Sequence, residues 1–321
     1  MGAAKINSAL RNTYTIAKRL QMISEQTAPS RTVEVNKRLI KCYDELGNNI
    51  DETTVRSFGE EWKAFHKFDD KELNRIGDQY FDLVTPGMYG KDKIAADFGC
   101  GTGRWTKYFS DKVGAIAAID PSDAIFSAAG VLEKTENVHL YKASIDNLPF
   151  PDNFFDFGFS LGVLHHIPDT QKAMNACVKK IRPGGYFLVY LYYDFDNRGL
   201  LFKLIYRLSN LIRLLVCRLP GSVKRFVCNI LAIIFYMPFV GLCRFLRMLG
   251  VPEKMRQKIP LQIYEKASFY IIRNDALDRF GTPLEQRFTK KEIMNMMENA
   301  GLSSIVFSPH APYWHAIGKK K

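Results

Sequence analysis

The chain has 321 residues, of which 47% are hydrophobic, 13% aromatic and 24% charged. This composition excludes a fibrous or disordered chain, and the length suits one large domain with an insertion or two modest domains. The formal net charge is +12, from 45 basic and 33 acidic residues. Such an excess favours a polyanionic partner, either a nucleic acid or an anionic membrane surface.

Almost all of the excess charge lies in one segment. Residues 198–258 contain twelve basic residues and a single acid, Glu253, which gives this segment +11 and leaves +1 for the rest of the chain. The sequence therefore predicts a nearly neutral body that carries one basic insert.

The N-terminal residues and the cysteines predict the compartment. Residues 1–20 have no apolar run long enough for a signal-peptide core, which argues against secretion. The six cysteines form no C-x-x-C pair and lie mostly in hydrophobic stretches, which predicts reduced core thiols and no zinc site. The expected location is the cytoplasm, either free or peripheral on the inner face of the membrane.

The first 85 residues are polar and are predicted to form a helical cover. Within them, Phe58, Trp62 and Phe65 recur at helical spacing. This stripe is more typical of a packing face than of a ligand site.

Short apolar runs alternate with helical stretches from Lys93 onward, which predicts a parallel sheet with helices on both faces. After a long interruption, a helix over Thr289–Ala300, capped by Thr289 and stopped by Gly301, resumes the pattern. The predicted strands are Ile94–Phe98, Ala115–Ile119, Val138–Tyr141, Phe155–Ser160, Gly185–Leu191, Ser303–Phe307 and Tyr313–Ile317.

The first of these strands ends in a glycine-rich loop, Asp97-Phe98-Gly99-Cys100-Gly101-Thr102-Gly103. Three glycines at alternate positions let the backbone turn tightly beneath a ligand. The spacing differs from the dinucleotide fingerprint and from the phosphate-binding loop. Asp120, at the tip of the second strand, can accept both hydroxyls of a ribose.

These features, together with three later segments, resemble the class I S-adenosylmethionine-dependent methyltransferases. The resemblance is to their small-molecule branch, methyltransferase type 11, which includes quinone and sugar methyltransferases. It covers about residues 93–195 and 287–320. The three segments are Ala143–Phe150, Phe155–Asp169 and Ile181–Gly185.

The resemblance implies an α/β fold with a Rossmann-like, doubly wound sheet of seven strands. The expected division is a helical N-terminal cover over residues 1–85, the cofactor-binding core over 86–195, a basic helical insert over 196–286, and a last helix with two strands over 287–321. The insert follows the fifth strand of the core.

The resemblance also implies S-adenosylmethionine as the cofactor and no metal. Asp97 would lie near the methionine ammonium, and the three loop glycines would line the methionine and ribose. Ser144 stands where many relatives have Asp. The implied contacts are Gly99, Gly101 and Gly103 for the loop, Asp120 followed by Pro121 for the ribose, Ser144 and Ile145 for the adenine edge, and Leu161 for backbone near the sulfonium.

Methyl transfer from a sulfonium requires alignment of the acceptor and, for a hydroxyl acceptor, removal of a proton. His165 and His166, after the fourth strand, are the candidate bases, although they could instead cap the next helix or bond to backbone. Asp278 and Arg279, in a predicted loop, could equally form a surface ion pair, and His315 could be a satisfied core residue. The candidate acceptor contacts are Tyr192, Tyr193, Asp194, Asp278, Arg279 and His315.

The expected acceptor is a small, amphipathic or lipid-linked molecule, such as a glycan, a quinone or a polyketide-like compound, methylated on oxygen, nitrogen or carbon. RNA methylation is an alternative. Against it, residues 160–163 are Ser-Leu-Gly-Val, where amino-methylating nucleic-acid enzymes carry an Asn/Asp-Pro-Pro-aromatic motif, and the chain has no Pro-Cys dipeptide. A non-catalytic methyltransferase-fold scaffold is a second alternative, but none of the expected glycines or acids is missing.

The basic insert is predicted to contain two helices. The first, Leu200–Leu219, places Lys203, Arg207, Asn210 and Arg218 in one stripe, with Arg213 further round and apolar residues on the remaining face. Pro220-Gly221 ends it, and Ser222 can cap a second helix in which residues 226–243 carry no charge. Three roles stay open: membrane docking or a lid for a lipid acceptor, a buried cap or homodimer interface, and a transmembrane span.

Overall fold

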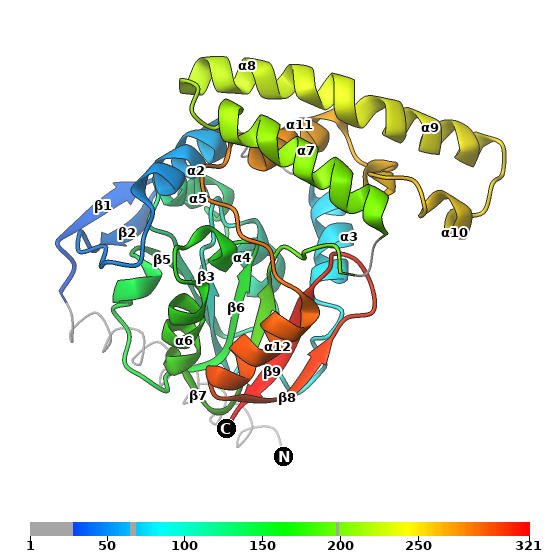
Figure 1. Ribbon diagram of the computed structural model, residues 1–321. Coiled ribbons are helices and arrows are strands. Elements are labelled where there is room, and N and C mark those ends of the chain that lie inside the picture. The colour runs from blue at the N-terminus through cyan, green and yellow to red at the C-terminus, as the bar shows by residue number, and fades with distance from the viewer. Residues whose placement is uncertain (1–27, 65–68, 197–198) are drawn as a thin grey trace. The chain divides into compact units, whose positions relative to one another are not determined.

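The computed structural model describes residues 28–64, 69–196 and 199–321 (Figure 1). The chain separates into two compact units. The first runs to Asp194 and resumes with Leu284–Lys321, and the second is Phe195–Pro283. The expected end of the insert at residue 286 is therefore three residues too late, because the backbone N–H of Leu284 donates to Thr54 Oγ1 and that of Gln286 to the His165 carbonyl, both in the first unit.

Nine strands of the described residues form one sheet in the first unit, in the order β1-β2-β5-β4-β3-β6-β7-β9-β8. The last seven positions of this order are the seven predicted strands, and they confirm the doubly wound α/β fold. The strand bounds are β1 Arg31–Val35, β2 Arg38–Cys42, β3 Ile94–Phe98, β4 Ala115–Ile119, β5 Val138–Lys142, β6 Phe155–Leu161, β7 Ile181–Tyr190, β8 Leu302–Phe307 and β9 His315–Lys320.

The first two strands correct the expectation that residues 1–85 are all helical, and they raise the strand count from seven to nine. β1 and β2 form an antiparallel hairpin whose turn places Asn36 and Lys37 at positive φ. β2 then pairs in parallel with β5, and its alternate residues Ile40 and Cys42 are buried. Two helices of the expected cover follow, α2 (Glu52–Ala64) and α3 (Asp70–Tyr80). The aromatic stripe is described only at Phe58, since Phe65 and the side chain of Trp62 lie outside the described residues.

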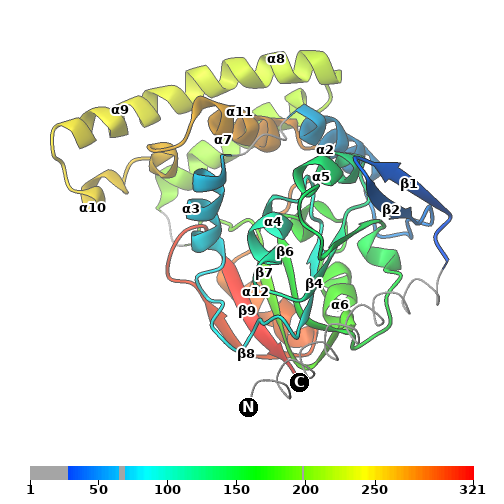
Figure 2. The same ribbon diagram turned by 180° about the vertical axis from the view of Figure 1, so that it is seen from behind.

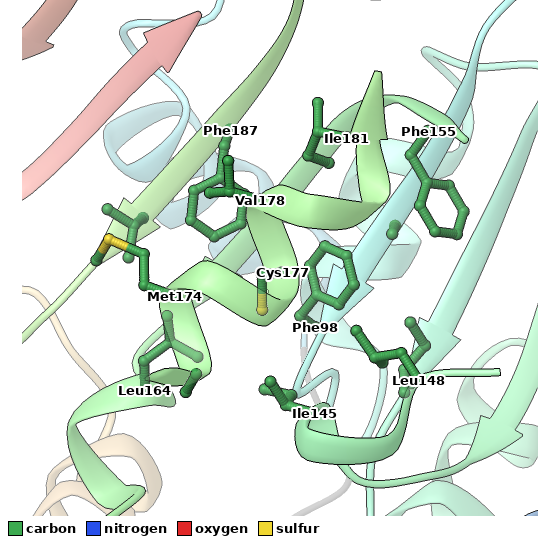
Figure 3. Close-up of a cluster of buried hydrophobic side chains, with 14 of the residues drawn as sticks. Phe98, Ile145, Leu148, Phe155, Leu164, Met174, Cys177, Val178, Ile181 and Phe187 are labelled. Carbon is green, nitrogen blue, oxygen red and sulfur yellow. The ribbon is translucent and has the colours of Figure 1, made fainter. Parts of the chain in front are cut away.

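Helices cover both faces of the sheet (Figures 1 and 2). On one face lie α6 (Thr170–Lys180) and α12 (Lys290–Asn299), and Figure 3 shows Met174, Cys177 and Val178 of α6 packed among the apolar side chains of the strands. On the other face lie α3, α4 (Arg104–Ser110) and α5 (Ala124–Val131). Because successive strand side chains alternate between faces, Ala96 and Phe98 point to the first face, and Asp97 points to the side of α4.

The second unit is helical. Its elements are α7 (Leu200–Val216), α8 (Gly221–Leu231), η3 (Ala232–Tyr236, a π-helical turn), α9 (Met237–Met248), α10 (Glu253–Arg256), η4 (Gln262–Tyr264) and α11 (Phe269–Gly281). α8, η3 and α9 form one continuous helix, Gly221–Met248, and it is the one helix among the described residues that is long and apolar enough to cross a membrane by length and composition.

Two expectations about this unit are wrong. Ser222 does not cap the second helix, because that helix already begins at Gly221 after Pro220. Asp278 and Arg279 lie in a helix, not in a loop, because Ser268 caps α11 and its apolar residues Ile272, Ala276 and Phe280 recur at helical spacing.

Candidate functional site

Asp97 is the last residue but one of the central strand β3, and its carboxyl group is buried. Thr106, in the first turn of α4, donates a hydrogen bond of 2.6 Å to Asp97 Oδ2. The other oxygen, Oδ1, is buried with no hydrogen-bond partner within the structure. A buried acceptor without a partner is costly, so this oxygen marks a place where a donor from a ligand fits.

The environment of Asp97 disfavours its charge. Burial raises the pKa of Asp97 to about 7, although the hydrogen bond from Thr106 opposes this shift, and the nearby Asp120 carboxylate adds to it. A cationic group beside Oδ1 would favour the ionised carboxylate, because it would replace the hydration that burial removes.

Asp120, after β4, is bonded to the glycine loop. Its Oδ2 accepts the backbone N–H of Gly101 at 2.9 Å, and its Oδ1 accepts both the N–H and the hydroxyl of Ser122, at 2.8 and 2.5 Å. Burial raises the pKa of Asp120, and these hydrogen bonds oppose the rise. A carboxylate has about four acceptor positions, so about one remains for a ligand hydroxyl unless Ser122 rotates away.

The glycine loop adopts backbone conformations that other residues disfavour. Gly99, Gly101 and Gly103 have φ of +86°, +54° and +80°. A Cβ at Gly99 would lie 2.4 Å from a methyl carbon of Val163, and one at Gly103 would lie 2.6 Å from Leu132. The loop therefore packs closely against the segment after β6 on one side and against α5 on the other.

The remaining predicted cofactor contacts are Pro121, Ser144, Ile145 and Leu161, and they differ in burial and in their partners. Pro121 is half-buried beside Asp120, and Leu161 is buried at the end of β6. The hydroxyl of Ser144 accepts the backbone N–H of Asp146 and so caps a short 3₁₀ turn. The side chain of Ile145 points into the core beneath α6 (Figure 3). Both side chains thus have structural roles, and their contact with an adenine ring stays a prediction.

His165 and His166 form a 3₁₀ turn after β6, and both are buried. Neither histidine caps α6, whose N-cap is Asp169. His166 Nδ1 lies 2.6 Å from the Leu284 carbonyl, while its Nε2 is buried without a partner. Both ring nitrogens of His165 are also buried without partners, and burial, followed by the charges of His166 and Arg287, lowers the pKa of His165 well below its usual range.

Aromatic rings gather around the two histidines. The Tyr192 ring lies 3.9 Å from that of His165, between ring centroids, and Phe58 packs edge-on against His166 at 4.9 Å. Tyr190 contacts both Tyr192 and Tyr80. The surroundings of the two histidines are therefore largely aromatic.

Three other predicted acceptor contacts, Tyr193, Asp194 and His315, make contacts within the protein. The Tyr193 ring packs on Tyr313, and the exposed Asp194 donates its backbone N–H to the Phe288 carbonyl. His315 is buried with both ring nitrogens occupied, by the Pro312 carbonyl and by Asp82 Oδ1, each at 2.7 Å. This matches the core role that the sequence left open for His315.

Asp278 and Arg279 belong to the second unit. Within it, Arg279 donates to Ser209 Oγ at 2.8 Å and stacks on the Tyr206 ring, and Asp278 accepts from Thr282. Their contact with an acceptor stays a prediction.

Sequence reasoning missed two threonines and one segment. Thr106 holds Asp97, and the Thr102 hydroxyl in the loop is buried without a partner. The segment 284–288 runs beside Tyr192–Asp194 and supplies the Leu284 carbonyl to His166. One signal for Thr106 was available in the sequence. It is a polar residue on the inner face of the short helix that directly follows the glycine loop.

In the part of the chain that the structure describes, no group of three or more His, Cys, Asp or Glu side chains is placed to hold a metal ion.

Residues 96–189 match the family described as "Methyltransferase domain". A demethylmenaquinone methyltransferase of Bacillus licheniformis is 28% identical over 169 residues, which are 50% of this chain and 62% of that protein. A ubiquinone biosynthesis O-methyltransferase of Rhizobium etli is 27% identical over 40% of this chain and 54% of that protein. A solved structure of a putative methyltransferase from Bacillus halodurans is 13% identical over 72% of this chain and 71% of that one, with a TM-score of 0.44. The chain thus spans between half and two thirds of the two curated relatives.

The groups at the ends of β3 and β4 fit the cofactor of this family. Asp97 offers an unpartnered buried oxygen to an ammonium, and Asp120 offers a remaining acceptor position to a ribose hydroxyl. The closely packed glycine backbone lies between the two carboxylates in the chain. The chain therefore carries a class I S-adenosylmethionine-dependent methyltransferase domain.

Proposed function

We propose that the protein transfers a methyl group from S-adenosylmethionine to a small, amphipathic acceptor with a quinone-like or lipid-linked ring. The observation that carries this proposal is the pair of buried carboxylates, Asp97 with one unpartnered oxygen and Asp120 bonded to Gly101. The two relatives, a demethylmenaquinone methyltransferase and a ubiquinone biosynthesis O-methyltransferase, support a quinone-type acceptor.

The residues of this chain bind and orient the cofactor. Asp97 accepts from its ammonium and Asp120 from its ribose, while the glycine backbone allows close approach. When bound, S-adenosylmethionine supplies an electrophilic methyl group whose leaving group is a neutral thioether, so no acid is needed to protonate it. The protein must then align the acceptor and accept its proton.

His166 is arranged to accept that proton. A backbone carbonyl can only accept a hydrogen bond, so the 2.6 Å contact with Leu284 assigns the ring proton to Nδ1 and leaves the lone pair on Nε2. Nε2 is buried and has no partner. The neighbouring His165 stays neutral at pH 7, because burial and nearby charge hold its pKa far below the usual range. A neutral neighbour places no second charge beside the imidazolium that forms on His166.

The rings of Tyr192, Tyr190 and Phe58 suit a planar, apolar acceptor. They surround the two histidines with aromatic faces and edges, which favour stacked or edge-on contact with another ring. This arrangement supports a cyclic acceptor whose hydroxyl, amine or ring carbon reaches the methyl group.

Calorimetric titration with S-adenosylmethionine tests the proposal. We expect the wild-type protein to bind, and Asp120→Ala to weaken binding by about tenfold to hundredfold, as expected for the loss of hydrogen bonds to a charged group. Asp123→Ala is the matched control, because Asp123 lies three residues on and pairs instead with Lys142. A wild-type protein that fails to bind would leave only the non-catalytic scaffold.

The acceptor is found by mass spectrometry of lipid and small-molecule extracts from cells with and without the protein. We expect one quinone-like or lipid-linked species to lose the mass of a single methylene unit when the protein is absent. A change confined to RNA would instead support the nucleic-acid alternative.

A further inference from the structure

The second unit has an unusual distribution of apolar surface. Among the described residues, all but two of the most exposed large hydrophobic side chains lie in this unit, and the two exceptions are Leu39 and Val306. A water-soluble helix buries its apolar stripe and exposes its polar one. Two segments of this unit, α7 and Gly221–Met248, instead leave many large apolar side chains exposed.

α7 shows this exposure of apolar side chains most simply. Five leucines, recurring every three or four residues, are exposed along one face: Leu200, Leu204, Leu208, Leu211 and Leu215. At 100° per residue they fall within about 80° of one another. On the opposite face, Ser209 accepts from Arg279 of α11, and the buried Arg213 donates to the Thr282 and Pro283 carbonyls. The exposed Arg207 lies beside the leucines.

The continuous helix Gly221–Met248 repeats this arrangement. Its inner face packs on α11, with Asn229 bonded to Arg273 and Tyr236 bonded to Asp275. Every exposed residue from 226 to 243 is apolar: Phe226, Ile230, Ile233, Ile234, Phe235, Pro238, Gly241 and Leu242. This uncharged stretch of 18 residues is about 27 Å long.

The basic residues of the insert divide into two groups. Several are used inside the unit: Arg213 on loop carbonyls, Arg244 on the Glu265 and Ala267 carbonyls, and Arg256 in a buried ion pair with Glu265. In the stripe expected for the first insert helix, Arg207 and Arg218 are exposed, and Asn210 accepts a hydrogen bond from Arg213. Other basic residues are exposed. Arg218, Arg225, Lys254 and Lys258 lie near the ends of the apolar faces, and Arg207 lies beside the leucines of α7.

We propose that the second unit docks on an anionic lipid bilayer, with the exposed apolar faces of α7 and of Gly221–Met248 inserted among the acyl chains at the surface. The exposed basic residues at the ends of these faces would lie at the height of the headgroups and favour anionic lipids.

Surface docking, and not a crossing of the membrane, follows from the inner face of the long helix. Of the most apolar stretch of Gly221–Met248, only 28% is buried within the structure. The inner face of this helix nevertheless bonds to charged residues of α11. Those charged partners would have to enter the hydrocarbon if the helix crossed the bilayer, which is costly. If the long helix lies in the plane of the surface, its apolar face enters lipid while α11 stays on the water side.

Co-sedimentation of the full chain with lipid vesicles tests this proposal without cofactor or acceptor, so its outcome is independent of methyl transfer. We expect the protein to sediment with vesicles of phosphatidylcholine and phosphatidylglycerol, and much less with phosphatidylcholine alone. Leu211→Glu and Phe226→Glu, on the two different helices, should each lower the partition coefficient by about tenfold or more, because an apolar group leaves the lipid and a charge replaces it.

Leu39→Glu is the matched control. Leu39 is 61% exposed in β2, compared with 59% for Leu211 and 66% for Phe226, so the three changes place a carboxylate at similarly exposed positions. Leu39→Glu should leave vesicle binding unchanged. Circular dichroism and thermal unfolding confirm that each variant is folded, and having a variant on each helix keeps the test decisive if one of them unfolds.

Other outcomes would overturn the proposal. Equal sedimentation with neutral and anionic vesicles would contradict the role of the basic residues. The protein could instead fail to sediment and form a dimer in light scattering. If Leu211→Glu or Phe226→Glu dissociated that dimer, the apolar faces would be assigned to contact with a second copy of the chain. No sedimentation of a monomeric protein would also refute docking on lipid.

Discussion

Thr106 and Asp97 are joined by a buried hydrogen bond of 2.6 Å, in which the Thr106 hydroxyl donates to Oδ2 of the carboxyl group. This bond uses one oxygen of Asp97 and leaves the other without a partner inside the protein. The folded protein thus satisfies the hydrogen bonding of only one of the two carboxyl oxygens, and burial opposes ionisation of the group. Stability and cofactor binding should both depend on the proton that this group carries.

The stability of the protein should fall as the pH rises from about 4 to about 7. The pKa of Asp97 is about 7 in the folded protein and 3.8 ordinarily, so between these values the unfolded chain has lost a proton that the folded protein keeps. Each pH unit in this window lowers the free energy of unfolding by up to about 1.4 kcal/mol, and the loss is complete above about pH 7. Asp97→Asn removes this titration and should therefore gain about 3 to 4 kcal/mol over the wild type between pH 4 and pH 8.

Urea unfolding of both proteins across this pH range measures the difference. Asp152→Asn is the control, and its effect on stability should be opposite, because hydrogen bonds from Lys180 and Lys179 hold the pKa of Asp152 below its usual value. Removing that group should cost stability above pH 4, not add it. Parallel curves for Asp97→Asn and the wild type would show that Asp97 is already ionised in the folded protein.

Loss of the Thr106 hydroxyl should shift the pH dependence of cofactor binding. The ammonium of S-adenosylmethionine favours an ionised Asp97, so affinity should rise with pH until Asp97 is fully ionised. The hydrogen bond from Thr106 lowers the pKa of Asp97, and Thr106→Val should therefore move the midpoint of this rise to higher pH. Calorimetry at several pH values gives the midpoint. Ser110→Ala, on the same helix, removes a hydroxyl that bonds to the Lys107 carbonyl and should leave the midpoint unchanged.

Gly99→Ala should destabilise the protein more than Gly87→Ala. Both glycines have positive φ, +86° and +98°, so each alanine costs about 1 kcal/mol of backbone strain. A Cβ at Gly87 meets nothing within 4 Å, whereas one at Gly99 would lie 2.4 Å from Val163. We expect an additional loss of about 1 to 3 kcal/mol for Gly99→Ala in denaturant unfolding. Val163→Ala should relieve this additional loss in the double variant, and strictly additive effects would contradict the contact.

Much of the sheet could be predicted because its strands are buried on both faces and read as short apolar runs, such as Ile94–Phe98 and Ala115–Ile119. The final helix was equally clear, since Thr289 and Glu292 form a capping box. The hairpin over residues 31–42 was missed. Its strands have only five residues each and no regular alternation, since β1 begins with two polar residues and Leu39 and Ile40 are adjacent in β2. Its turn residues Asn36 and Lys37 are not the usual glycine pair.

The orientation of the insert helices could not be read from their sequence. A helical wheel separates the polar and apolar faces of α7, but it does not show which face turns inward. Arg213 points inward because the Thr282 and Pro283 carbonyls, far away in the chain, need donors. The bond between Thr106 and Asp97 was missed for a related reason, since a side-chain pairing depends on where the helix after the loop lies on the sheet.

His166 should be needed for methyl transfer but not for cofactor binding. Its Nε2 is the buried, unpartnered nitrogen of a ring whose Nδ1 is fixed by the Leu284 carbonyl. For a hydroxyl acceptor, His166→Ala should lower the turnover rate by about a hundredfold to ten thousandfold, while the affinity for S-adenosylmethionine stays within about threefold. The rate is measured as transfer of labelled methyl from S-adenosylmethionine into a lipid extract, and added imidazole should restore part of it by replacing the missing base. His310→Ala is the control, because His310 is an exposed histidine in the loop before β9. A His166→Ala protein that retains the wild-type rate, or that imidazole does not affect, would show that the proton leaves by another route.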